Sequence, residues 1–268
     1  MKNQLLFILI LFLLASCKKE DNQGSHTNTV SNNVHIDSFP LAVGHTWKYY
    51  SELHMIDSLG TNYFISRYDN LWSTVSDTFV NGELSTKILQ IDSNYNGMID
   101  SCYTYYANRV DGLYGVAYLG NGTMFYFKST TPFLNINNSS FGLLINPPVS
   151  VDTVFVPATS LRLLKFPSII HDSWLSYEYN VPIPDIIKRR WIGVKTITTN
   201  AGVFNCLELQ MFWDVDNDNI PDSGTANILQ YFSEKGLIQE EYHQTISYSG
   251  SNQTDSVYRI SKLTQINF

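Results

Sequence analysis

The sequence predicts an all-β fold built from two similar antiparallel β modules, with few or short helices. Apolar and polar residues alternate, or nearly alternate, in segments such as 86–91 and 207–211, as they do in strands with one buried face. Aromatic residues, which favour strands, make up 14% of the chain. No stretch keeps a helical periodicity over three turns, so any helices should be short.

Asparagine and glycine mark the predicted turns between strands. Asn81-Gly82 and Asn200-Ala201-Gly202 each predict a tight connection, and Gly120-Asn121-Gly122 predicts a hairpin turn. Both residue types tolerate the positive φ that such turns require.

The N-terminus predicts a secreted, lipid-anchored protein. Leu5–Ala15 is an apolar run of signal-peptide length, too short to span a bilayer, and Leu14-Ala15-Ser16-Cys17 follows it. This tetrad resembles the lipobox of bacterial lipoproteins, which implies a signal peptide at 1–16, a lipid on Cys17 and a membrane as partner. The alternative is an ordinary signal with a cysteine nearby. Residues 17–34 carry the lipid and a polar, flexible tether.

Two further phrases resemble lipoproteins of the Bacteroidota. The charged segment 18–21 resembles the tag of lipoproteins exported to the outer face of the outer membrane, which implies cell-surface exposure; a periplasm-facing anchor with a solvated spacer is the alternative. The pattern Phe-Pro-Leu-x-x-Gly-x-x-Trp-x-Tyr at 39–49, with segment 201–238, resembles a loosely defined group of secreted lipoproteins without an assigned activity. That resemblance implies a β fold and carries over no catalytic residue.

The charge of the chain limits the kinds of partner to expect, and its cysteines leave a disulfide open. Removing residues 1–16 takes away Lys2 and no acid, which leaves 16 basic against 24 acidic residues. Nucleic acid is therefore not expected as a partner, and a cell-surface protein or a glycan is. Cys102 and Cys206 could pair in an oxidising compartment or serve as two small buried apolar residues.

The chain also repeats itself in a fixed order. Phe39-Pro40-x6-Trp47 is matched by Phe166-Pro167-x6-Trp174, and Trp72 is matched by Trp191. Ordered self-similarity is the signature of a repeated unit.

The matches predict β modules at 35–157 and 158–268. The alternative is that weak motifs recur by chance in an aromatic-rich chain.

An aspartate-rich loop in the second module predicts a structural calcium site. Its acidic residues stand at positions 1, 3, 5 and 9 of the loop: Asp214, Asp216, Asp218 and Asp222. The loop differs from an EF-hand because Asn219 replaces glycine at position 6 and Thr225 replaces glutamate at position 12. It resembles the calcium loops of thrombospondin type 3 repeats, and a solvated turn is the alternative.

The corresponding loop in the first module predicts a weaker site, with only two carboxylates. Its candidate ligands are Asp92, Asn94, Asn96 and Asp100. Asparagine and glycine also build such turns without a metal.

Catalytic motifs do not emerge from the sequence. His171-Asp172-Ser173 are adjacent residues that would point different ways on a strand, which disfavours a triad. Glu240-Glu241 with His243 could supply an acid and a base, but an exposed strand edge is the interpretation that we favour for them. We therefore predict a non-enzymatic binding or structural module; the alternatives are a hydrolase of glycans or peptides and a carrier of an apolar ligand in a half-open β barrel.

Overall fold

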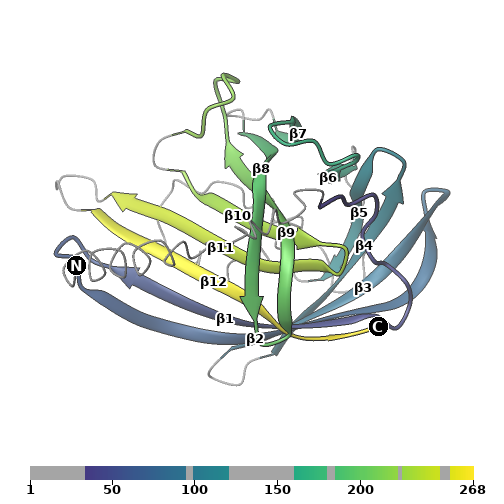
Figure 1. The fold of residues 1–268 in the computed structure, drawn as a ribbon, viewed down its shortest axis with the longest axis horizontal. Helices are drawn as coiled ribbons and strands as arrows, with labels where there is room; N and C mark the ends of the chain where they lie inside the picture. The colour runs from purple at the N-terminus through teal and green to yellow at the C-terminus, as the bar shows by residue number, and fades with distance from the viewer. Residues whose placement is uncertain (1–33, 95–98, 121–159, 180–184, 223–224, 248–253) are drawn as a thin grey trace, which may run out of the picture. The chain divides into compact units, whose positions relative to one another are not determined.

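The structure is a computed structural model that describes residues 34–94, 99–120, 160–179, 185–222, 225–247 and 254–268. The chain divides into the units Met1–Asn33 and Val34–Phe268, and only the second holds described residues. Cys17 thus lies outside the described residues, as do residues 121 and 122 of the predicted turn at 120–122. Every regular element in the described part is a β-strand, which confirms the all-β prediction (Figure 1).

The strands form two successive meanders, in which each strand pairs with the next. The first contains β1 (Thr46–Ile56), β2 (Asn62–Val80), β3 (Glu83–Asn94), β4 (Ile99–Arg109), β5 (Gly112–Gly120) and β6 (Leu161–Lys165). The second contains β7 (Ser173–Tyr179), β8 (Asp185–Thr199), β9 (Gly202–Trp213), β10 (Asn227–Ser233), β11 (Gly236–Ser247) and β12 (Thr254–Asn267).

The predicted turns at Asn81-Gly82 and Asn200-Ala201 connect strands as expected. Asn81 and Gly82 have φ angles of 51° and 82°, and they join Val80 to its cross-strand partner Glu83. Two positive φ values match the right-handed twist of the flanking strands, as in a type I′ hairpin.

The two meanders share one 12-stranded sheet, because β1 pairs antiparallel with β12 along its whole length. The sheet order is β6-β5-β4-β3-β2-β1-β12-β11-β10-β9-β8-β7, so the second meander repeats the strand order of the first. Trp47 and Trp174 lie in the first strands of their meanders, and Trp72 and Trp191 lie in the second strands. Duplication of one module into two stays a prediction.

Side chains join the two edge strands where the sheet curls into a nearly closed barrel. In the described part, no backbone ladder links β6 to β7. Instead, Trp174 Nε1 and Ser176 Oγ donate to the carbonyl of Arg162 at 3.1 and 3.0 Å. Arg189 and Trp191 donate to the carbonyls of Leu163 and Lys165, each at 3.2 Å. These bonds satisfy edge carbonyls that would otherwise be open to pairing with another chain.

Aromatic rings fill one end of the interior. Phe39 packs against Trp47 and Phe232, with centroid separations of 5.8 and 6.4 Å, and Trp191 lies 6.3 Å from Phe232. Trp47 is fully buried and donates its indole N–H to the carbonyl of Lys235 at 2.7 Å. The rings therefore pack on one another and meet their polar needs within the protein.

Cys102 and Cys206 are both buried and do not form a disulfide with each other, as in the second alternative that the sequence left open. Burial, and then the negative charge of Glu234, raises the pKa of the Cys206 thiol to about 12. The thiol is thus protonated at neutral pH and behaves as a small apolar group.

Candidate functional site

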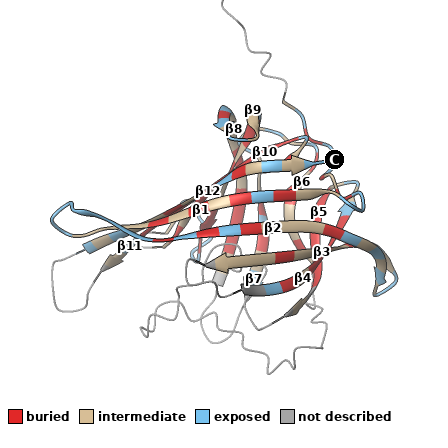
Figure 2. Cartoon of the chain, turned by 90° about the horizontal axis from the view of Figure 1, so that it is seen from below, coloured by how far each residue is buried: buried red, intermediate tan, exposed pale blue. Residues whose placement is uncertain are grey.

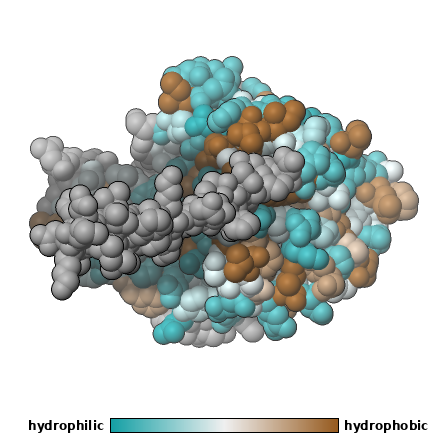
Figure 3. All heavy atoms as spheres, viewed as in Figure 1, coloured by the Kyte–Doolittle hydropathy of each residue, from teal (hydrophilic) through white to brown (hydrophobic). Residues whose placement is uncertain are grey.

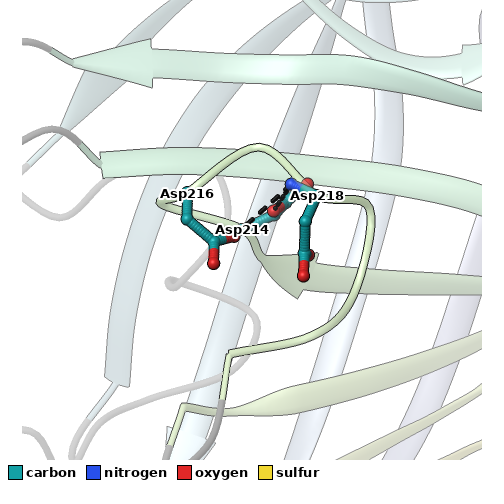
Figure 4. A group of neighbouring side chains, drawn as sticks. All are labelled: Asp214, Asp216 and Asp218. Carbon is teal, nitrogen blue, oxygen red and sulfur yellow. Dashed lines mark hydrogen bonds between the residues drawn. The ribbon is translucent and has the colours of Figure 1, made fainter.

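The aspartate-rich loop follows β9 and brings three of its predicted ligands together. Asp214, Asp216 and Asp218 each offer a carboxylate oxygen within 4.8 Å of the others, a group that could hold a metal ion (Figure 4). Asp214 is buried, whereas Asp216 and Asp218 are exposed.

A lysine side chain compensates the buried carboxylate of this loop. Lys188 Nζ lies 2.6 Å from Asp214 Oδ2 and donates to Asn219 Oδ1 at 2.8 Å. The backbone N–H groups of Asp218 and Asn219 donate to the two oxygens of Asp214 at 2.9 and 3.0 Å. Burial opposes ionisation of Asp214, but the Lys188 and backbone donors outweigh it, so the pKa of Asp214 is lowered. A metal ion at Asp214 would have to share this carboxylate with Lys188.

The other aspartates of the loop hold the turn through the backbone. Ile220 N–H donates to Asp218 Oδ1 at 2.7 Å, and Val215 N–H donates to Asp222 Oδ2 at 2.8 Å. Desolvation raises the pKa of Asp216; the N–H of Asp218 partly offsets this, and the charges of Asp218 and Asp222 add to it. A cation bound beside Asp216 would offset the charges of Asp218 and Asp222.

The two departures from the EF-hand pattern have structural explanations. Asn219 has a φ of 65° and so adopts the left-handed conformation for which an EF-hand uses glycine. Thr225 Oγ1 donates to the carbonyl of Asp222 at 2.6 Å, which makes its hydroxyl part of the turn.

The structure describes only part of the weaker loop. Asp92 of β3 lies directly opposite Asp100 of β4, and Asp92 Oδ1 accepts a hydrogen bond from Asn70 Nδ2 at 2.6 Å. Asn96 and the side chains of Asn94 and Asp100 lie outside the described residues.

Glu240, which the sequence placed on an exposed strand edge, is instead buried inside the barrel, so that interpretation is wrong. β11 lies between β10 and β12, and alternation turns Glu240 inward. Glu240 forms an ion pair with Arg259, and each side chain is 3% exposed. Glu241 follows on the other face, where its Oε1 accepts from Gln239 Nε2 at 2.6 Å.

A chain of buried and partly buried polar groups extends from this ion pair to the junction between β6 and β7. Gln230 Nε2 donates to Glu240 Oε2 at 2.7 Å, Arg189 Nη1 donates to Gln230 Oε1 at 3.1 Å, and Arg189 Nε donates to Ser176 Oγ at 3.1 Å. Burial lowers the pKa of Arg259, and the charge of Glu240 opposes that shift. In the described structure, both oxygens of the Glu240 carboxylate therefore take part in structural contacts, with Arg259 and Gln230.

Within the described residues, His171-Asp172-Ser173 make no contact with one another that is typical of a catalytic triad. Asp172 Oδ2 lies 2.7 Å from Lys165 Nζ, and the backbone N–H of His171 donates to the carbonyl of Trp191 at 2.7 Å. The Asp172 carboxylate is therefore part of the turn between β6 and β7.

An aromatic row crosses the sheet at the far ends of four neighbouring strands. Its members are direct cross-strand partners: Phe64 of β2, His54 of β1, Tyr258 of β12 and His243 of β11. Successive ring centroids are 5.5, 4.9 and 6.0 Å apart. The preceding or following residues Leu53, Arg259 and Tyr242 are buried, so alternation turns the row outward. Phe64 is 52% exposed.

Polar side chains border this row and hold one another in place. Asn62 Nδ2 donates to the hydroxyl of Tyr258 at 2.9 Å, and Asn62 Oδ1 lies 3.3 Å from His54 Nδ1. Glu52 Oε2 lies 3.7 Å from His54 Nε2, and the guanidinium of Arg67 lies 5.8 Å from the centre of the Phe64 ring.

The ends of β1 and β2 that carry the row project from the barrel; the first residues of β2 are exposed, and the last residues of β1 are partly exposed (Figure 2). On the described surface visible in Figure 3, hydrophobic residues form several groups separated by hydrophilic ones. Within the described ranges, no helix has both the length and the apolar character needed to cross a membrane.

Comparison with known proteins gives structural resemblance without sequence similarity. No family model and no curated protein matches the chain. A solved structure from Bacteroides fragilis, described provisionally as an exported protein with a YmcC-like fold, is 11% identical, with a TM-score of 0.41 over 86% of this chain and 99% of its own. A provisionally described lipoprotein from Parabacteroides distasonis is 13% identical, with a TM-score of 0.39 over 85% and 97%. A provisionally described outer-membrane lipoprotein-sorting domain from Vibrio parahaemolyticus is 9% identical, with a TM-score of 0.21 over 84% and 85%.

Proposed function

We propose that the protein is a lipid-anchored, extracytoplasmic β module that binds a partner through its outer surface and does not act as an enzyme. The aromatic row is the observation that carries this proposal, because it places four rings and fixed polar groups side by side on an outward face. Aromatic residues of this kind are enriched where proteins bind partners.

Contacts inside the barrel favour the function of binding at the outer surface over the alternative functions of a carrier or a hydrolase. The rings that suggested a carrier pack on one another around Trp47 and Trp191. The buried carboxylate of Glu240 is held by Arg259 and Gln230. The aromatic rings thus form part of the packed core, and the Glu240 carboxylate is part of a buried ion pair.

The anchor belongs to the same proposal. A lipid on Cys17 and the tether 18–34 would hold the barrel at the outer membrane, outward-facing. A flexible tether of this length has an average span of about 20–25 Å. The described chain begins at Val34, and Phe39 packs against Trp47, while His54 lies seven residues further along β1, at roughly 23 Å. The row therefore lies away from the point where the described chain begins.

We also propose that the aspartate-rich loop binds calcium as a structural ion. Asp216 and Asp218 supply exposed hard oxygen ligands, Asp222 lies in the same turn, and Asp214 is shared with Lys188. Desolvation, and then the charges of Asp218 and Asp222, raise the pKa of Asp216, and calcium would relieve the repulsion between these charges.

Fractionation tests the anchor, and envelope binding tests the surface. Cys17→Ala should release a soluble form or block maturation, whereas a variant that still fractionates with membranes like the wild type contradicts the lipid. Detergent-solubilised protein should bind to envelopes of cells that lack it, and Phe64→Ala should weaken that binding. Phe79→Ala is the matched control, since Phe79 is 72% exposed on the same strand, β2. Equal retention of both variants would contradict a binding role for the row.

A further inference from the structure

We infer that the aromatic row binds a neutral oligosaccharide. This inference rests on the proposed function, because it names the chemical class of the partner that the same surface binds. It follows from the dimensions of the row, its chemistry and its charge.

The row has the dimensions of a site for a narrow, elongated ligand. Its members occupy one register position on four strands, and strands lie about 4.8 Å apart, so the outer two are separated by roughly 14 Å. A stable protein interface covers about 800 Å² on each partner and about 20–30 residues. A row of four side chains with its polar border is much smaller, which favours a short saccharide over a protein surface.

The chemistry of the row matches the two kinds of surface that a sugar presents. The π face of an aromatic ring carries partial negative charge and attracts the C–H groups on the apolar face of a sugar ring. The rings of Tyr258 and its two histidine neighbours stack on one another, so Phe64, which is 52% exposed, is the ring of the row that can offer its face. Carboxylate, amide and guanidinium groups can hydrogen-bond its hydroxyls, and Glu52, Asn62 and Arg67 bring these groups to the border of the row. Contacts with His54, Tyr258 and Phe64 already restrain these side chains, which reduces the entropy lost on binding.

Charge around the row disfavours an anionic ligand. Glu52 and Glu241 lie on the same outer face, and Asp57 and Asp255 lie at the adjoining strand ends, where Ser58 N–H donates to Asp255 Oδ1 at 3.1 Å. Arg67 is the basic residue nearest to Phe64 among the described contacts. A phosphate or sulfate group would meet net negative charge here, whereas a neutral sugar would not.

Calorimetric titration tests the inference on the full-length lipoprotein in detergent micelles. The probes are neutral oligosaccharides of glucose, mannose, galactose, xylose and N-acetylglucosamine. At least one should bind the wild type and Phe79→Ala equally. Phe64→Ala should bind it about tenfold more weakly, which corresponds to about 1.4 kcal/mol. Asn62→Ala, at an exposed position, should also weaken binding, and unchanged melting curves will show that both variants are folded.

Two results would overturn the inference: no probe binds the wild type, or Phe64→Ala and Asn62→Ala bind the probe as the wild type does. If envelope binding still depends on Phe64 while every saccharide fails, the proposed function stands and the ligand is a protein. If envelope binding and saccharide binding are both absent, the proposed function fails as well.

Discussion

The buried Glu240–Arg259 ion pair should make Glu240→Gln one of the most damaging conservative substitutions in the chain. Both residues are 2% exposed, so the substitution removes from the buried guanidinium the negative charge that contributes most among those acting on it. Breaking a buried pair from one side costs about 3–5 kcal/mol. In a domain of this size each kcal/mol lowers Tm by about 2–4 °C, so the expected drop is roughly 6–20 °C.

A surface ion pair of the same chemistry provides the control. Glu83 and Arg109 make two hydrogen bonds of 2.6 Å, but their side chains are 32% and 35% exposed. Because solvent screens such a pair, Glu83→Gln should cost at most about 1 kcal/mol. The double variant Glu240→Leu with Arg259→Met removes both charges and should come close to wild-type stability.

Thermal and urea unfolding of the wild type and the variants measure these differences. Two results would refute the reasoning: Glu240→Gln losing no more stability than Glu83→Gln, or the double variant losing as much as Glu240→Gln. An unchanged m value is required for the comparison, since a changed slope would mean a changed denatured or native state.

Three further predictions concern the aspartate-rich loop and the aromatic end of the interior. Calcium at about a hundred times its Kd should stabilise the wild type by roughly 2.7 kcal/mol relative to chelator. Asp216→Asn should remove most of that gain and should raise the stability of the protein in chelator. Equal melting curves of the wild type in calcium and in chelator would refute the site. Lys188→Met should destabilise the protein by about 3–5 kcal/mol in chelator and increase the stabilisation by calcium. Because the pKa of Asp214 is lowered, the stabilisation by the Lys188–Asp214 pair is present above about pH 4 and is lost as the pH falls through the lowered pKa. This loss should be missing from the acid unfolding profile of the variant. Gly236→Ala should cost about 1–3 kcal/mol, because Gly236 has a φ of 96° and an added Cβ would lie 3.1 Å from Trp47 Nε1; urea unfolding with no measurable loss would contradict this.

Local pattern was sufficient to predict the fold class and several turns. Strand alternation and Asn81-Gly82 depend on neighbouring residues alone, and both predictions are confirmed. The Asp214–Asp222 loop was also visible as a spacing, and the structure brings its first three carboxylates together. Lys188 was not predicted, because it comes from β8 and its approach to Asp214 depends on tertiary structure.

Long-range pairing explains what the sequence did not reveal. The aromatic row exists because β1 pairs with β12, which places His54 beside Tyr258 although about 200 residues separate them. The inward side of β11 was equally hidden, since a glutamate is expected at the surface unless its partner is known. Arg259 is that partner, and it belongs to a different strand from Glu240.

The seam between β6 and β7 gives the barrel a defined line of weakness. Every other strand junction is a backbone ladder, whereas this one depends on a few side-chain donors such as Trp174 and Arg189 in the described residues. Local opening proceeds where the fewest interactions must break together. The barrel should therefore open locally between β6 and β7. Exchange of the amide hydrogens of β6 should be faster than exchange at the β1–β12 junction, because opening that junction would require the two meanders to separate.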